Sequence, residues 1–317
     1  MLSMKKCSYE KRFYYWFSII LILLFLMLSC NNMDSHNLSN RNGVLFNPKV
    51  GTAYEYKINE TKEIEQTIGA KENKVKLTFA CEIGLQYKIL DKSNNGNYEI
   101  FVQFDHYIVD NRSDNGIEDD YGEKDSTLHQ KDLGAFKNAT FTFNLAANGK
   151  IENIKGYNEF KKRYDILNYT NKATGDGFIS FPDAFFKEEY FKDIFEKISG
   201  VLPDEMVFIK SSWLRKTSLE IGDPQNLTAQ YTLYGIQDRN AYIKATSPVE
   251  QKITALNHSV SLKGKEDGVI EIEAETGMLI ISDRKSSIKG NLKIGGAKVN
   301  VIVNRSSMII GKKLKTV

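Results

Sequence analysis

The chain has 317 residues, of which 43 are Lys or Arg, 40 are Asp or Glu and 41% are hydrophobic. This length can bury a substantial core, as one large or two moderate domains. Residues 1–29 hold four of the basic residues and one acidic residue, so the remainder has 39 of each and is formally neutral. A neutral chain has no general basic field, which argues against nucleic acid as a partner.

The stretch from Lys5 to Cys30 has the layout of an export signal. A basic start is followed by the run Phe13 to Leu28, which is almost wholly apolar and shorter than the roughly 20 residues that span a bilayer. The tetrad Met27-Leu28-Ser29-Cys30 resembles a bacterial lipobox, with a small residue at the cut and a thiol that accepts the lipid. We predict a signal peptide over residues 1–29 and lipidation of Cys30. The alternative is an uncleaved signal anchor with a buried Cys30.

Residues 30–47 are polar and show little periodicity, which predicts a lipidated, flexible tether. The lipid on Cys30 makes the membrane a predicted partner, because two or three acyl chains anchor a protein stably. No acidic cluster follows Cys30, and this favours a position facing the periplasm over one on the cell surface. The expected location is the bacterial outer membrane, reached by export.

Residues 48–155 form the first predicted β region. Gly51 to Ile58 starts a strand, and from Val75 to Ile89 the odd positions are apolar while the even positions are mostly polar. This alternation predicts a strand with one buried face. A turn at residues 94–97 leads to a return strand, residues 98–108, so we expect a long hairpin with a bend or bulge. Residues 141–154 form a second hairpin, which turns at Asn148-Gly149.

The acidic stretch from Asp110 to Asp125 lies within this region. Its first residues loosely resemble a calcium loop, but Gly122 occupies the position of the closing glutamate. A solvated acidic loop is therefore the preferred interpretation.

Residues 156–205 form a predicted helical insertion. Phe186, Tyr190, Ile194 and Ile198 fall on one helical stripe, which predicts core packing rather than a ligand platform. Residues 182–183, Pro-Asp, suit the first turn, and Gly200 suits the C-terminal cap.

Residues 206–317 return to strands, with a hairpin turn at Thr276-Gly277, and form a second β region. This region resembles a weak repeat of the first, because the hairpin at 141–154 has a counterpart at 269–281. We therefore predict a mainly β (α+β) fold with long antiparallel strands. The strands form one or two curved sheets or half-barrels, with a helical insertion near 156–200.

The sequence offers few groups for chemistry. Cys81 lies in an apolar alternation and is expected in the core. His106 and His258 each interrupt an apolar strand face and are expected to be core or rim residues rather than ligands. No metal-ligand spacing, nucleophile elbow, phosphate loop or dinucleotide fingerprint is present. We predict no catalytic, cofactor-binding or metal residue, and lipidation at Cys30 is the one assigned site.

Several short marks occur in a characteristic order along most of the chain. They are Gly51-x-x-Tyr54-x-Tyr56, Asn148-Gly149-Lys150 with Gly156-Tyr157, Leu202-Pro203-Asp204, Trp213, Tyr231-x-Leu233 and Glu275-Thr276-Gly277. In this order the chain resembles a family of uncharacterised bacterial lipoproteins, a domain of unknown function common in Bacteroidota. The family has a Gly shortly before the Trp, where this chain has Lys210-Ser211-Ser212. The resemblance implies a β-rich exported lipoprotein and supplies no activity or catalytic residue.

Three functions remain open from the sequence. The first is a non-catalytic envelope lipoprotein that binds or scaffolds another envelope component, such as a protein. The second is a periplasmic carrier or binder of lipid or another apolar ligand, held in a half-barrel under a helical lid. The third is a carboxylate-dependent hydrolase, which needs two carboxylates across one cleft. We expect the first, and we expect no enzyme activity.

Overall fold

The computed structural model describes residues 43–69, 73–114, 131–132, 134–147, 149–174, 186–219, 225–255, 258–294 and 297–315. Residues 42–317 form one compact unit. The predicted signal peptide, Cys30 and most of the tether lie outside the described residues. No helix within these ranges combines the length and the apolar character needed to cross a membrane.

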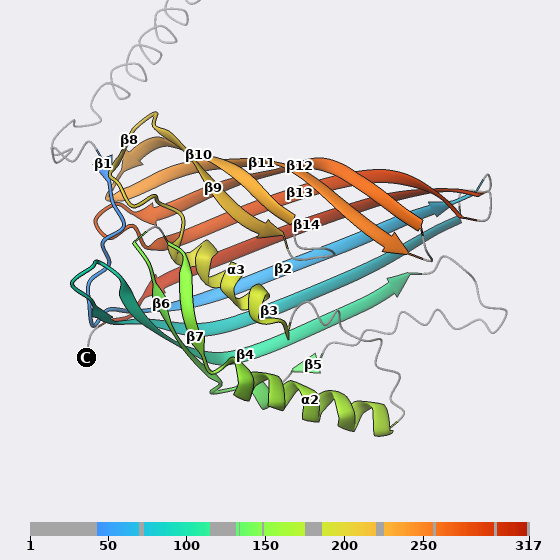
Figure 1. Cartoon of the computed structure of the whole chain (residues 1–317), viewed down its shortest axis with the longest axis horizontal. Coiled ribbons are helices and arrows are strands. Elements are labelled where there is room, and N and C mark those ends of the chain that lie inside the picture. The colour runs from blue at the N-terminus through green and yellow to red at the C-terminus, as the bar shows by residue number, and fades with distance from the viewer. Residues whose placement is uncertain are drawn as a thin grey trace, which may run out of the picture. The chain divides into compact units, whose positions relative to one another are not determined.

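The compact unit is built on one large antiparallel sheet (Figure 1). Its strand order is β7-β6-β4-β3-β2-β14-β13-β12-β11-β10-β9, and β5 pairs with β4 outside this path. The last strand, β14, pairs with β2 over a long register, from Val299 opposite Ile68 to Lys313 opposite Tyr54. The two predicted β regions therefore share a single sheet, which is open and ends in β7 and β9. Strands β1 and β8 form a separate pair.

The strands of the large sheet have the following bounds: β2 Ala53–Ile68, β3 Asn73–Lys92, β4 Tyr98–Asp114, β5 Lys131–Asp132, β6 Thr140–Leu145, β7 Ile151–Lys155, β9 Ser212–Leu219, β10 Gln225–Gln237, β11 Asn240–Ala255, β12 His258–Glu273, β13 Leu279–Ile294 and β14 Ala297–Lys313. The separate pair consists of β1 Gly43–Val44 and β8 Val207–Phe208. The helices are η1 Gly134–Phe136, α2 Tyr157–Thr174 and α3 Glu188–Ser199. A mainly β fold with a helical insertion is confirmed.

Alternation of side chains gives the sheet two faces. We call the face that packs against α3 the inner face and the opposite one the outer face. The predicted long hairpin is β3 and β4, and the predicted bulge lies where Gly84 pairs with His106 while Leu85 pairs with Phe104. The extra residue reverses the alternation of β4, so Tyr107 is fully buried on the inner face. The placement of His106 on the apolar face was therefore wrong, because a bulge cannot be read from period-two spacing.

Helix α3 carries three residues of the predicted apolar stripe, and Phe186 lies two residues before the helix begins. All four stripe residues are buried. The helix begins at Glu188, while the predicted start at residues 182–183 lies outside the described residues. Gly200 caps its end as predicted, with its N–H donating to Glu196 O at 2.7 Å. The stripe packs into the core, since the ring of Phe186 lies 5.7 Å from that of Tyr107. The neighbouring ring of Phe191 lies 4.7 Å from that of Phe160 and 5.3 Å from that of Phe141.

The buried apolar residues form two separate clusters. The larger one joins the aromatic rings of α2, α3, β4 and β6 to the inner residues of most strands. The smaller one, called here the aliphatic cluster, comes from β2 and β11–β14 alone, and its members are Ile64, Val249, Leu262, Ile288, Val299, Val301 and Val303. The two clusters lie at different levels along the same strands.

The aromatic packing predicts a large cost for truncating Phe191. Phe191→Ala removes a fully buried ring that packs against rings on β4, β6 and α2. We expect the substitution to destabilise the fold by about 3–5 kcal/mol. Urea unfolding followed by circular dichroism measures the change. Ile166→Ala on α2, where the side chain is 68% exposed, is the matched control and should change stability by less than about 0.5 kcal/mol. Equal effects of the two variants would contradict this core assignment.

Candidate functional site

A band of polar residues crosses the inner face between the two apolar clusters. Strand register fixes its first row, in which neighbours lie directly opposite each other: Lys62, Arg305, Ser286, Glu266 and Ser247. A second row toward α3 contains Glu60, Ser307 and Arg284. On the side of the first row that faces away from α3, the next inner-face row is aliphatic. Its members are Ile64, Val303, Ile288, Gly264 and Val249. The inner face thus changes from charged to aliphatic within one step of the alternation.

Glu60 is the centre of the part of the band under α3. Its carboxylate accepts hydrogen bonds from Tyr190 Oη at 2.9 Å and Ser307 Oγ at 3.0 Å, and it lies 3.2 Å from Lys197 Nζ. Lys197 Nζ also lies 2.7 Å from Asp193. Burial alone would raise the pKa of Glu60, but the Lys197 charge and these hydrogen bonds hold it below its usual value. The network binds α3 to β2 and β14.

Arg284 anchors the other side of the band. Its side chain is 4% exposed, it donates to Tyr231 Oη at 3.1 Å, and it lies 3.6 Å from Glu266. Burial would lower the pKa of Arg284, but Tyr231 and Glu266 outweigh it and the pKa is raised. A small pocket of about 20 Å³ lies beside Arg284, Lys197 and Tyr231. These contacts connect β13 to β10 and β12 through a charged group that is itself satisfied.

Lys62 and Arg305 differ from these groups because they face each other as like charges. Lys62 is 8% exposed, and burial together with the Arg305 charge lowers its pKa to about 7. Arg305 Nη2 donates to Gln251 Oε1 at 2.7 Å. Its Nε and Nη1 are buried and have no hydrogen-bond partner among the described residues. Unpaired buried donors are uncommon in folded proteins, so this pair stands out as a candidate site.

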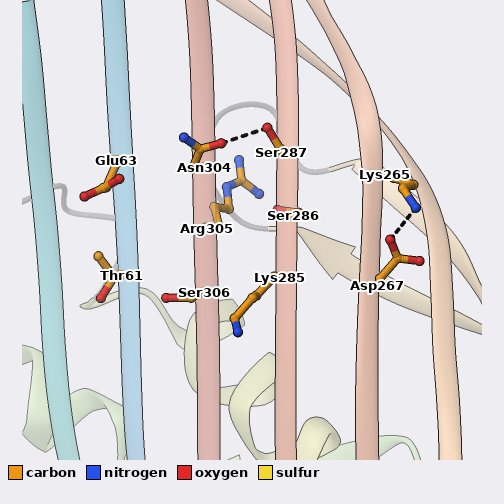
Figure 2. Close-up of a pocket in the computed structure, with 10 residues that line it drawn as sticks. All are labelled: Thr61, Glu63, Lys265, Asp267, Lys285, Ser286, Ser287, Asn304, Arg305 and Ser306. Carbon is orange, nitrogen blue, oxygen red and sulfur yellow. Dashed lines mark hydrogen bonds and ion pairs between the residues drawn. The ribbon is translucent and has the colours of Figure 1, made fainter.

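The outer face carries a polar depression of about 520 Å³, which Figure 2 shows. Its lining consists of eight outer-face residues, Thr61, Glu63, Lys265, Asp267, Lys285, Ser287, Asn304 and Ser306, together with Ser286 and Arg305 of the inner-face row. Several lining groups pair with each other, as Lys265 does with Asp267 at 2.6 Å and Ser287 Oγ with Asn304 Oδ1 at 2.7 Å. The depression is thus lined by polar residues, several of which already have partners.

The residues singled out from the sequence are dispersed. Cys81 is buried with Sγ 3.2 Å from Tyr190 Oη, and burial raises the pKa of its thiol, which confirms a core role. His106 lies on the outer face with Nε2 3.2 Å from Glu82. The side chain of His258, the acidic stretch beyond Asp114 and Cys30 lie outside the described residues. Within the described ranges, no three His, Cys, Asp or Glu side chains group as metal ligands.

The charged band was missed at the sequence level. A signal for it existed, because Glu60 and Lys62 continue the inward phase of Tyr54, Tyr56 and Ile58. Period-two spacing alone does not distinguish a buried polar row from the end of a buried face.

The marks that carry the family resemblance meet at one end of the sheet. A side chain at Gly149 would come within 2.6 Å of Gly200 Cα, and one at Gly277 within 2.9 Å of Leu202. Trp213 Nε1 donates to Val201 O at 3.0 Å. These marks hold the segment after α3 against two hairpin turns, so their role is architectural.

This open antiparallel sheet with a helical insertion on its inner face defines the class of the protein. A family of unknown function, DUF6263, matches residues 95–279, which is more than half of the chain. The chain therefore belongs to the DUF6263 family, and the resemblance to a domain of unknown function is confirmed. No curated protein matches the chain.

Similar solved structures share at most an arrangement of strands. A structure of lipovitellin concerned with lipid–protein interactions has 10% identity and a TM-score of 0.49, and the match covers 85% of this chain but 26% of that one. The ETEC pilotin–secretin AspS–GspD complex has 10% identity and a TM-score of 0.19, and the match covers 94% of this chain and 53% of that one. The TodX monoaromatic hydrocarbon channel has 6% identity and a TM-score of 0.20, and the match covers 84% of this chain and 91% of that one. Matches this remote say nothing about function.

Replacement by Met should change the free energy of unfolding in opposite directions at two buried lysines, Lys197 of α3 and Lys62 of β2. Lys197→Met leaves Glu60 and Asp193 buried without their cation, and we expect a loss of about 3–5 kcal/mol. Lys62→Met removes a buried charge that faces Arg305, and we expect a gain of about 1–3 kcal/mol at pH 6. Urea unfolding of ligand-free protein measures both, with Lys57→Met as an exposed control.

The gain from Lys62→Met should depend on pH. Lys62 keeps its proton up to about pH 7 in the folded state, where its pKa is lowered, and up to its ordinary pKa of 10.5 in the unfolded state. Because the unfolded state binds more protons between these values, the stability of the unsubstituted protein rises with pH in that window. The advantage of Lys62→Met therefore shrinks toward pH 10. A gain independent of pH would show that the burial of Lys62 is not its cause.

Proposed function

We propose that the protein is a non-catalytic, lipid-anchored protein of the bacterial envelope that binds another envelope component on the inner face of its sheet. The observation that supports this most is the step from charged to aliphatic rows across β2, β14, β13, β12 and β11. Such a surface suits a component that is itself partly polar and partly apolar. This favours the binder of an apolar or amphipathic ligand among the functions considered.

The states of Glu60 and Cys81 support a non-catalytic role for these two groups. The oxygens of Glu60 are occupied by Tyr190, Ser307 and Lys197. A general acid or base needs a pKa near the working pH, whereas the pKa of Glu60 is lowered. Burial raises the pKa of Cys81, which opposes formation of a thiolate nucleophile. These groups stabilise the fold.

A protein partner is the second candidate, favoured by a patch on and around β8. Met206, Phe208 and Ile209 are 51%, 49% and 45% exposed. Strand β8 pairs with β1, the first described element, which lies in the last part of the predicted tether. Exposed apolar side chains gathered in one stretch are typical of contact surfaces.

Anchoring predicts a clear effect of Cys30→Ser. The variant lacks the thiol that accepts lipid, so it should leave the membrane fraction and lose incorporation of labelled fatty acid, while its fold persists. Fractionation of cells that express both forms measures this, with Cys81→Ser as a control for loss of a thiol. Retention of Cys30→Ser in the membrane would contradict lipid anchoring and favour an uncleaved signal anchor.

Native mass spectrometry tests the binding function. The chain from residue 31 retains the whole compact unit and would be purified from a bacterial periplasm. We expect an added mass that disappears on denaturation and matches an apolar or amphipathic molecule. A bare monomer that instead cross-links to an envelope protein would favour the second candidate.

A further inference from the structure

We propose that Lys62 and Arg305 form a binding site for the anionic head of an amphiphile whose acyl chain lies along the aliphatic cluster. The inference rests on the proposed function and names its ligand class: a singly charged carboxylate or phosphate joined to an aliphatic chain. Three independent observations support it, namely unpaired donors, an unbalanced charge and the position of the aliphatic rows.

The unpaired donors are those of Arg305. Its guanidinium has one described acceptor, Gln251, and two buried nitrogens, Nε and Nη1, without a partner. Ser286 Oγ, directly opposite Arg305 in the register, is also buried and unpartnered. A guanidinium binds carboxylates and phosphates through two parallel N–H groups, so an oxyanion fits the donors that remain.

The charges of the band do not balance among the described residues. Its cations are Lys62, Lys197, Arg284 and Arg305, and its carboxylates are Glu60, Asp193 and Glu266. Lys197 lies near two of the carboxylates, and Arg284 lies near the third. Below about pH 7, where Lys62 is protonated, one positive charge is therefore left over among these groups. A buried charge without a counterion is costly, and a monoanion would neutralise it.

The aliphatic rows begin one step beyond the pair. Ile64 follows Lys62 by two residues on the same face of β2, and Val303 stands in the same relation to Arg305 on β14. Val301, Ile288, Leu262 and Val249 continue this apolar lining across the neighbouring strands, and each is at most 5% exposed. A head held by Lys62 and Arg305 thus places its chain on apolar side chains.

The open sheet provides a way to admit the chain. The strand path ends in β7 and β9, which are not paired with each other in the described part of the sheet. Glu196 of α3 accepts a hydrogen bond from Ile151 N at the start of β7, and Val201 after α3 accepts one from Trp213 on β9. Admission of the acyl chain therefore requires the sheet to separate at the level of the aliphatic cluster, away from these contacts. The aliphatic cluster contains no described helix residue, so α3 need not leave the aromatic core.

The test is calorimetric titration of the chain from residue 31 with dodecanoate, 1-dodecanol and inorganic phosphate. Dodecanoate should bind at least about tenfold more tightly than dodecanol, because the alcohol lacks the charge. It should also bind more tightly than octanoate, by roughly threefold to fourfold for each added methylene that is buried. Dodecyl phosphate should bind like dodecanoate, and inorganic phosphate should bind far more weakly.

Two variants assign the site. Arg305→Gln and Lys62→Met should each weaken dodecanoate at least about tenfold and leave dodecanol unchanged, whereas the outer-face control Lys57→Met should change neither. Affinity for dodecanoate should fall from pH 6.5 to pH 9, because Lys62 must take up a proton on binding above about pH 7. Lys62→Met should remove this fall. A fold that was merely damaged would lose dodecanol as well.

Three outcomes would overturn the inference. They are equal binding of dodecanol and dodecanoate, equal binding of phosphate and dodecanoate, and absence of dodecanoate binding to the unsubstituted chain. If a co-purified apolar mass is present while dodecanoate does not bind, the inference fails and the proposed function stands. If neither is found, both fail.

Discussion

The pairing of β2 with β14 is the constraint on which the rest of the structure depends. It joins strands from opposite ends of the compact unit, and its register places Lys62 opposite Arg305 and Glu60 opposite Ser307. Side chains in a strand alternate, so a slip of one residue would turn this whole row to the outer face. The core, the charged band and the aliphatic cluster therefore follow from one register.

Burial of charge under α3 is possible because each group there has a partner. The cost of desolvating Lys197 is offset by two carboxylates and that of Glu60 by three donors. The contrast with Lys62 and Arg305, a few ångströms along the same strands, is informative. One part of the band is self-sufficient and stabilises the fold, whereas the other part is left with donors and charge that an external anion would satisfy.

Membership of the DUF6263 family adds architecture rather than chemistry. The marks on which the resemblance rests meet where Gly149, Gly200 and Gly277 allow backbones to approach closely. The contacts among these residues fix the end of α3 against the sheet and so determine where Lys197 reaches Glu60. The residues of the candidate ligand site lie elsewhere, in the long strands, where side chains can differ without disturbing the contacts at the end of α3.

The sequence by itself determined the class of fold, the long hairpin of β3 and β4 and the core role of the α3 stripe. Each of these depends on local periodicity, and periodicity is a property of neighbouring residues. Only the tertiary structure decided that both β regions share one sheet, that a bulge turns His106 outward and that Lys62 meets Arg305. The contacts between β2 and β14 join residues more than two hundred positions apart. The register of these strands and the position of the bulge are set by packing across strands, which no local pattern records.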